Sequence, residues 1–157
     1  MVKSARILIV GHNGLVGQAM VRALRRLGFP NLCFRSMFEP DMRDRSAVFE
    51  YLNRSSPEVV MMCSDRSSDS HIAGGHSQDR LVDNLSLEMD LVDASDYFDV
   101  ARFISIFTPP NYPSRRKGPI SEERMLSGEI EEGNAGNAAS VIACIKYCEA
   151  LREQFGK

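Results

Sequence analysis

Three glycines at a spacing of three residues, Gly11, Gly14 and Gly17, are the residues in this sequence whose pattern points most clearly to chemistry. In such a loop the first glycine permits a tight turn, the second lets backbone N–H groups approach a phosphate, and the third lets a helix pack closely on a strand. The helix N-terminus adds a favourable potential for an anion. The pattern predicts a cradle for the pyrophosphate of a dinucleotide, while a glycine loop that only packs remains the alternative. The residues assigned to the cradle are Gly11, His12, Asn13, Gly14, Leu15, Val16 and Gly17.

Arg35 is the second candidate for cofactor binding, because it ends the apolar run NLCFR at residues 31–35. An acidic residue at this point would accept a hydrogen bond from the ribose 2′-hydroxyl of NAD, whereas an arginine can pair with the 2′-phosphate of NADP. Arg35 therefore favours NADP over NAD. A solvated arginine without a ligand explains the residue equally well.

The elements that must position these residues alternate between short apolar runs and amphipathic segments. Strands are predicted at residues 6–10, 31–35, 58–64 and 101–107, and helices at 15–27, 46–53, 81–97 and 138–155. On the third helix the expected core stripe is Leu81, Leu85, Met89 and Val92. This order predicts right-handed crossovers and an α/β fold, a Rossmann-like doubly wound parallel sheet truncated to about four or five strands. We expect one domain over residues 1–157, with a long loop over 108–136.

Composition and charge exclude several classes of function. The formal charge of −2 provides no general attraction to nucleic acid or to an anionic membrane. The N-terminus lacks the apolar stretch of a signal peptide, so a cytoplasmic location is expected. The four cysteines have no metal-ligand spacing, and His71 and His76 have no matching ligand pattern, so reduced core thiols and no metal are expected.

Four segments in order along the chain resemble the N-terminal part of GDP-L-fucose synthase, an extended short-chain dehydrogenase/reductase. They are ARILIVGHNGLVGQAMVRALRRLG, LCFRSMFEPDMRD, DNLSLEMDLVDAS and NAASVIACIKYCEALREQFG. The resemblance implies that the three glycines line the pyrophosphate and that Asp41 and Met42 lie near the adenine. It also places Asn84 inside the helix after the third strand. Asn13 stands where the family often has a basic residue, which weakens the preference for NADP.

The same resemblance implies that the catalytic residues are missing. Members of the superfamily use a serine after the fourth strand and a Tyr-x-x-x-Lys pair on the next helix, where the tyrosine transfers a proton and the lysine lowers its pKa. The corresponding positions here are Pro109, Asn137 and Val141. An amide has no useful proton at neutral pH, and valine has neither charge nor donor. The chain also ends with this helix, so the family's substrate domain is expected to be absent.

These features favour a non-catalytic relative, a pseudoenzyme that still binds NADP or NAD and acts in regulation or assembly. One alternative is an active epimerase or reductase that uses other residues or a partner chain, and another is a purely structural interaction module. Helices 81–97 and 138–155 resemble the pair that forms an intersubunit four-helix bundle in this superfamily. We therefore expect a homodimer, or a heterodimer with a full-length relative, with a monomer as the alternative.

Overall fold

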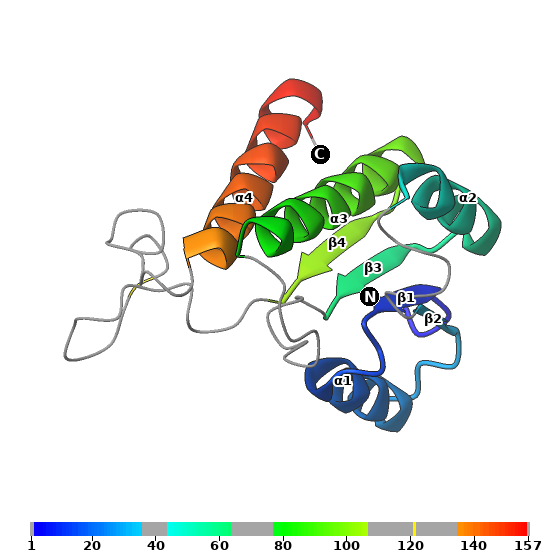
Figure 1. The fold of residues 1–157 in the computed structure, drawn as a ribbon. Coiled ribbons are helices and arrows are strands. Elements are labelled where there is room, and N and C mark those ends of the chain that lie inside the picture. The colour runs from blue at the N-terminus through cyan, green and yellow to red at the C-terminus, as the bar shows by residue number, and fades with distance from the viewer. Residues whose placement is uncertain (1, 36–43, 64–76, 107–120, 122–134, 157) are drawn as a thin grey trace. The chain divides into compact units, whose positions relative to one another are not determined.

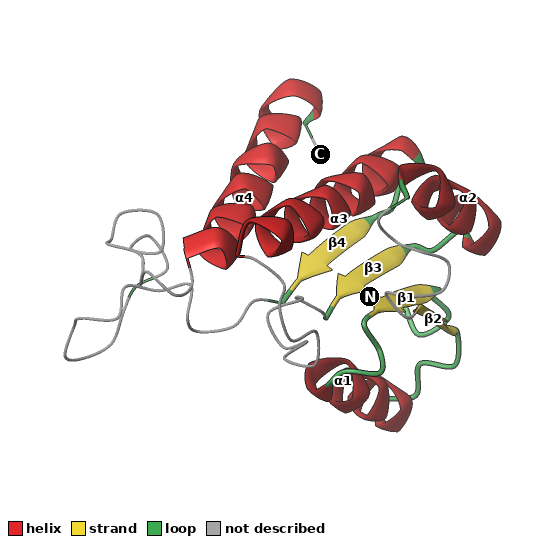
Figure 2. Cartoon of the chain, viewed as in Figure 1, coloured by secondary structure: helices red, strands yellow, loops and turns green. Residues whose placement is uncertain are grey.

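The computed structural model describes residues 2–35, 44–63, 77–106, 121 and 135–156 as alternating strands and helices (Figures 1 and 2). The strands are β1 (Ile7–Val10), β2 (Leu32–Arg35), β3 (Val59–Met62) and β4 (Arg102–Ser105). The helices are α1 (Leu15–Arg26), α2 (Arg45–Ser55), α3 (Ser77–Tyr97) and α4 (Ala135–Phe155). Every predicted strand and helix is present, although the strands are shorter than predicted and α3 and α4 begin earlier.

The chain divides into two compact units. The first comprises residues 1–64 and 90–106, and the second comprises 65–89 and 107–157. The first unit holds the sheet, α1, α2 and the last two turns of α3, and the second holds the beginning of α3 and all of α4. The single domain over residues 1–157 stays a prediction.

The sheet is parallel throughout its described strands, in the order β2-β1-β3-β4. Leu8 on β1 pairs with Cys33 on β2 and with Val60 on β3, and Val60 pairs in turn with Phe103 on β4. Every residue of β1 and β3 is buried. This is the burial expected for central strands whose two faces are both covered, and it explains their unbroken apolar sequences. The parallel Rossmann-like fold predicted from the sequence is confirmed.

Two chain crossovers leave β1 and β3 in opposite directions. The segment through α1 leads from β1 to β2, and the segment through α3 leads from β3 to β4. Right-handed crossovers in opposite directions place their helices on opposite faces of the sheet, and Figure 1 shows α1 on one side with α2 and the end of α3 on the other. Ile7 and Ile9 point to the α1 side, where they share a core cluster with Leu24 and Phe29.

The buried face of α3 differs from the predicted stripe. Leu81, Leu85 and Met89 are only half-buried, and only Val92 of the predicted four is buried. The buried side chains are Asn84, Leu87, Glu88, Leu91, Val92, Ala94 and Ser95. The prediction was wrong for three of the four because it selected apolar residues, whereas the helix also buries three polar side chains, those of Asn84, Glu88 and Ser95. No helix in the described part of the chain combines the length and the apolar character needed to cross a bilayer.

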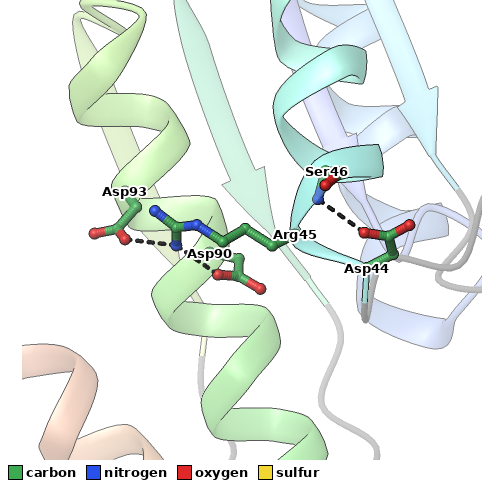
Figure 3. Close-up of polar contacts among 5 residues, drawn as sticks. All are labelled: Asp44, Arg45, Ser46, Asp90 and Asp93. Atoms are coloured by element: carbon green, nitrogen blue, oxygen red, sulfur yellow. Dashed lines mark hydrogen bonds and ion pairs between the residues drawn. The ribbon is translucent and has the colours of Figure 1, made fainter.

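Helix α2 has a capping residue at each end. The Asp44 carboxylate accepts a hydrogen bond from the Ser46 N–H at 2.8 Å (Figure 3), which satisfies one of the donors exposed at a helix start. At the other end Ser56 adopts a left-handed conformation, with φ of 42°, and its N–H donates to the Leu52 carbonyl at 2.8 Å. Both ends of helix α2 are therefore capped by hydrogen bonds.

Arg45 connects the start of α2 to the last turns of α3. Its Nη1 lies 2.7 Å from a carboxylate oxygen of Asp90 and 2.7 Å from one of Asp93 (Figure 3). The guanidinium also lies 4.7 Å from the centre of the Phe49 ring. The hydrogen bonds to Asp93 and then to Asp90 raise the pKa of Arg45 above its ordinary value. The arginine therefore stays charged throughout the accessible pH range and bridges two helices.

Replacing Arg45 with glutamine is expected to lower the melting temperature by a few degrees, because two partly buried carboxylates lose their cation. The difference should shrink in 0.5 M NaCl, since salt screens the attraction in the wild type. Lys146→Gln is the matched control, because Lys146 pairs at 2.7 Å with Glu149 on its own helix and both side chains are exposed. An equal effect of the two substitutions would contradict a bridging role for Arg45.

Candidate functional site

The glycine loop lies at the carboxyl end of β1, between the neighbouring strands β2 and β3. The connections of the sheet diverge at this strand, and ligands of open α/β sheets bind outside the strand ends at such a point. Gly11 has a φ of 77°, in the left-handed region that glycine enters readily. The Gly14 N–H donates to the Gly11 carbonyl at 3.1 Å and closes the turn.

Gly17 brings α1 against this turn. It is buried, and a Cβ atom placed on it would lie 2.1 Å from the Gly11 oxygen and 2.7 Å from the His12 Cα. Both distances are far below van der Waals contact, and both neighbours are backbone atoms that cannot rotate away. The loop and the helix can therefore adopt this arrangement only with glycine at position 17.

Gly14 has a different environment. Its φ of −76° is accessible to any residue, and a Cβ atom would lie at an ordinary distance of 3.4 Å from the Gly11 oxygen. The residue is exposed. Nothing in the described structure requires glycine here, so the missing side chain leaves open space on the outer side of the loop. This is the feature expected where a phosphate must come close to the backbone.

The N-terminus of α1 is also available to an anion. Gly14 is the N-cap and supplies no side-chain hydrogen bond, and the first helical bond runs from Gln18 N to Gly14 O at 2.9 Å. The N–H groups of the first turn that come before Gln18 therefore have no acceptor within the helix. The first turn has no acidic side chain, and Leu15 is 88% exposed. The residues present fit the pyrophosphate of a dinucleotide, since backbone donors, helix dipole and open space coincide.

His12 and Asn13 complete the loop. The His12 ring lies 5.3 Å from the Phe34 ring of β2, and its buried Nδ1 has no hydrogen-bond partner among the described residues. The Asn13 carbonyl accepts a hydrogen bond at 2.8 Å from the side chain of Gln18. Gln18 was not predicted from the sequence. The available signal was its polar side chain on the first helical turn, five residues after Asn13, from where it can donate a hydrogen bond back to the loop. The His12 Nδ1 is therefore a buried polar atom without a hydrogen-bond partner among the described residues, next to the loop.

Arg35 ends β2 and pairs in register with Val10, the residue just before the loop. Arg35 and the glycine loop consequently lie at the carboxyl ends of adjacent strands, as the NADP hypothesis requires. Asp41, Met42 and Pro109 lie outside the described residues. Their assignments to the adenine and to the catalytic serine position stay predictions.

The two helical positions predicted to correspond to the family's proton-transfer residues are both on α4, and this correspondence stays a prediction. Asn137 lies in its first turn and Val141 one turn later. Val141 is 2% exposed. A buried aliphatic side chain cannot lower the pKa of a neighbouring acid or hold a ribose hydroxyl. Asn84 lies within α3, as expected, and is buried.

Comparisons with known proteins agree with the parallel Rossmann-like fold and identify the family. The model of the NAD dependent epimerase/dehydratase family matches residues 7–157. Putative GDP-L-fucose synthase 2 of Oryza sativa subsp. japonica is 31% identical over 155 residues, which cover 98% of this chain and 45% of the relative. GDP-L-fucose synthase 1 of Arabidopsis thaliana is 30% identical over 154 residues, which cover 98% and 48%.

A solved structure is also similar to this chain in fold and in sequence. GDP-mannoheptose C4 reductase from Campylobacter jejuni, with NADP bound, matches with a TM-score of 0.89 and 27% identity, covering 100% of this chain and 50% of that one. This chain spans about half the length of the relatives that it matches. The family match over nearly the whole chain, together with the parallel sheet and the glycine loop at its strand ends, shows that this chain belongs to the NAD dependent epimerase/dehydratase family, as a relative of the GDP-L-fucose synthases.

Proposed function

We propose that this chain is a Rossmann-like domain that binds NADP or NAD through its glycine loop, does not catalyse hydride transfer, and acts in regulation or assembly. The observation that carries the binding proposal is Gly14, whose missing side chain serves no packing purpose in the described structure. Arg35 at the end of β2 supports NADP as the preferred form. A bound nicotinamide dinucleotide would supply the hydride chemistry of the family, and the residues of the cradle would only hold its pyrophosphate.

The loss of catalysis is supported by Val141 in particular. A tyrosine acts as a proton donor near neutral pH when a positive charge one turn away lowers its pKa. Here that position holds a buried valine, and the tyrosine position holds Asn137. No ionisable side chain occupies either position. The two residues that transfer and stabilise the proton in the family are thus replaced by residues without that chemistry.

Isothermal titration calorimetry of the purified chain with NADP, NADPH, NAD and NADH tests this function. We expect binding of at least one of the four, with the 2′-phosphorylated forms preferred. No oxidation or reduction of the cofactor should follow when GDP-4-keto-6-deoxy sugars are added. Turnover would favour an enzyme that uses other residues or a partner chain, and the absence of any binding would favour a purely structural module.

We also propose that α3 and α4 pack against a second copy of this chain, or against a full-length relative, mainly through residues 81–97 and 138–155. These helices expose large apolar side chains, since Val82 is 55%, Tyr97 71% and Phe155 54% exposed. Light scattering should give twice the chain mass. Leu151→Glu should lower that mass, because the charge would enter the apolar interface. A monomer at micromolar concentration without a copurifying partner would contradict this assembly.

A further inference from the structure

A hollow of about 380 Å³ lies between the end of α1 and strand β2. Gly28, where the chain leaves α1, has a φ of 78°, and a Cβ atom placed on it would meet nothing within 4 Å. Volumes of about 300–1,000 Å³ are typical of sites for small molecules, so the hollow is large enough for a small ligand. The residues that line it are Arg25, Gly28, Phe29, Pro30, Leu32 and Phe34.

The walls of the hollow are mainly apolar, and two of them are aromatic rings with a cation beside each. The Arg25 guanidinium lies 5.6 Å from the centre of the Phe34 ring, and the Lys3 Nζ lies 4.5 Å from the centre of the Phe29 ring. Leu32 and Phe34 are only partly buried, so their side chains still present apolar surface. Guanidinium planes and phenyl rings both stack on planar π systems, and these walls therefore suit a flat ring.

The charge at this end of α1 is positive. Arg22, Arg25 and Arg26 lie within two turns of the helix, and all three are exposed. In the part of the chain that the structure describes, no carboxylate pairs with any of them, in contrast to Arg45 on α2. The first 38 residues of the sequence contain no Asp or Glu. An anion at the hollow would therefore meet positive charge that no carboxylate already neutralises.

We propose that this hollow binds a planar aromatic anion, with its ring against Leu32 and Phe34 and its anionic group on the Arg25 guanidinium. The guanidinium has five N–H donors in a rigid fork, which matches two oxygens of a carboxylate, sulfonate or phosphate. The hollow is separate from the glycine loop, because the two lie at opposite ends of α1, a helix of 12 residues and about 18 Å.

Titration of the isotope-labelled full chain with 2-naphthoate, followed by NMR, tests this site. Naphthoate should shift the amide signals of Gly28, Leu32 and Phe34, which line the hollow. The neutral amide of the same shape, 2-naphthamide, should bind about tenfold more weakly, because it cannot form a charge-assisted hydrogen bond. Decahydro-2-naphthoate keeps the charge but is not planar, and it should also bind more weakly. Equal affinities for all three compounds would overturn the proposal.

Two arginine variants locate the anionic group. Arg25→Gln should weaken the binding of naphthoate about tenfold, because the charged donor is lost. Arg22→Gln is the matched control, since it removes the same charge from the same helix at an exposed position that does not line the hollow. Its affinity should stay close to that of the wild type. Equal effects of the two substitutions would show attraction by the helix in general and would overturn a site at Arg25.

A third variant fills the hollow. Asparagine tolerates the left-handed backbone of Gly28, and its side chain in Gly28→Asn would enter the open space beside this residue. Binding of naphthoate should therefore weaken, while the urea midpoint, followed by circular dichroism, should stay near that of the wild type. Unchanged affinity in a folded Gly28→Asn variant would contradict a ligand in the hollow.

A competition with NADP separates the hollow from the glycine loop. Saturating NADP should not displace naphthoate, and Gly14→Val should bind naphthoate as the wild type does. Displacement by NADP together with lost binding in Gly14→Val would place the ring in the dinucleotide site and overturn the proposal, and so would the absence of naphthoate binding. A chain that binds naphthoate at the hollow but no dinucleotide would support this proposal and refute the proposed function.

Discussion

Replacing Gly17 with alanine is expected to destabilise the chain strongly and to remove the cradle with it. A single methyl group at this position would lie 2.1 Å from the Gly11 oxygen and 2.7 Å from the His12 Cα. Overpacking of a close contact costs about 1–3 kcal/mol and more where only backbone can move. We expect at least the upper end of this range, because α1 must shift away from β1 to accommodate the methyl group.

Urea unfolding followed by circular dichroism measures the effect. Gly14→Ala is the matched control, because it adds the same methyl group to the same loop at a position with ordinary contacts and a permissive φ. Its midpoint should lie close to that of the wild type. Equal stability of the Gly17→Ala variant and the wild type would show that the loop and the helix are not held as tightly as their geometry indicates.

The second large effect is expected at Gly14, on binding and not on stability. Valine at this position fits the backbone, but its branched side chain would fill the space above the loop where a pyrophosphate approaches. We expect the affinity for NADP to fall about 100-fold or more, which corresponds to about 2.7 kcal/mol. The stability should fall by no more than about 1 kcal/mol, the difference between glycine and a branched residue at an N-cap.

Calorimetry of a size series gives this prediction its control. Gly14→Ala should bind more weakly than the wild type, and Gly14→Val more weakly still, while both unfold near the wild-type midpoint. Unchanged affinity in the valine variant would remove the cradle as the binding site. If the wild type binds no dinucleotide, the proposed function fails, whereas the prediction for Gly17 keeps its own test.

Much of the fold followed from local patterns. The apolar run at residues 6–10, ended by Gly11, matches the buried central strand β1 (Ile7–Val10), because strands covered on both faces need no polar alternation. The order of strands and helices predicted parallel pairing with crossover connections, which the strand pairing and the sheet order confirm. The position of the glycine loop at the first junction between strand and helix followed from the same reasoning.

Other features depended on contacts between residues far apart in the sequence. The stripe predicted for α3 was wrong because hydrophobicity alone cannot show that Asn84 and Glu88 turn inward. The bridge from Arg45 to Asp90 and Asp93 joins segments 45 and 48 residues apart, so no local pattern identifies it. Such pairs form only when the sheet brings their helices together.

The glycine loop shows the division most clearly. The amino-acid sequence by itself determined that a loop of this spacing joins a buried strand to a helix, since spacing and hydrophobicity are local properties. Only the tertiary structure showed which glycine is required for packing. A side chain at Gly17 would collide with the Gly11 backbone, whereas a side chain at Gly14 would meet no such collision. Steric exclusion depends on the distance between atoms of separate elements, and that distance exists only once α1 is packed against the end of β1.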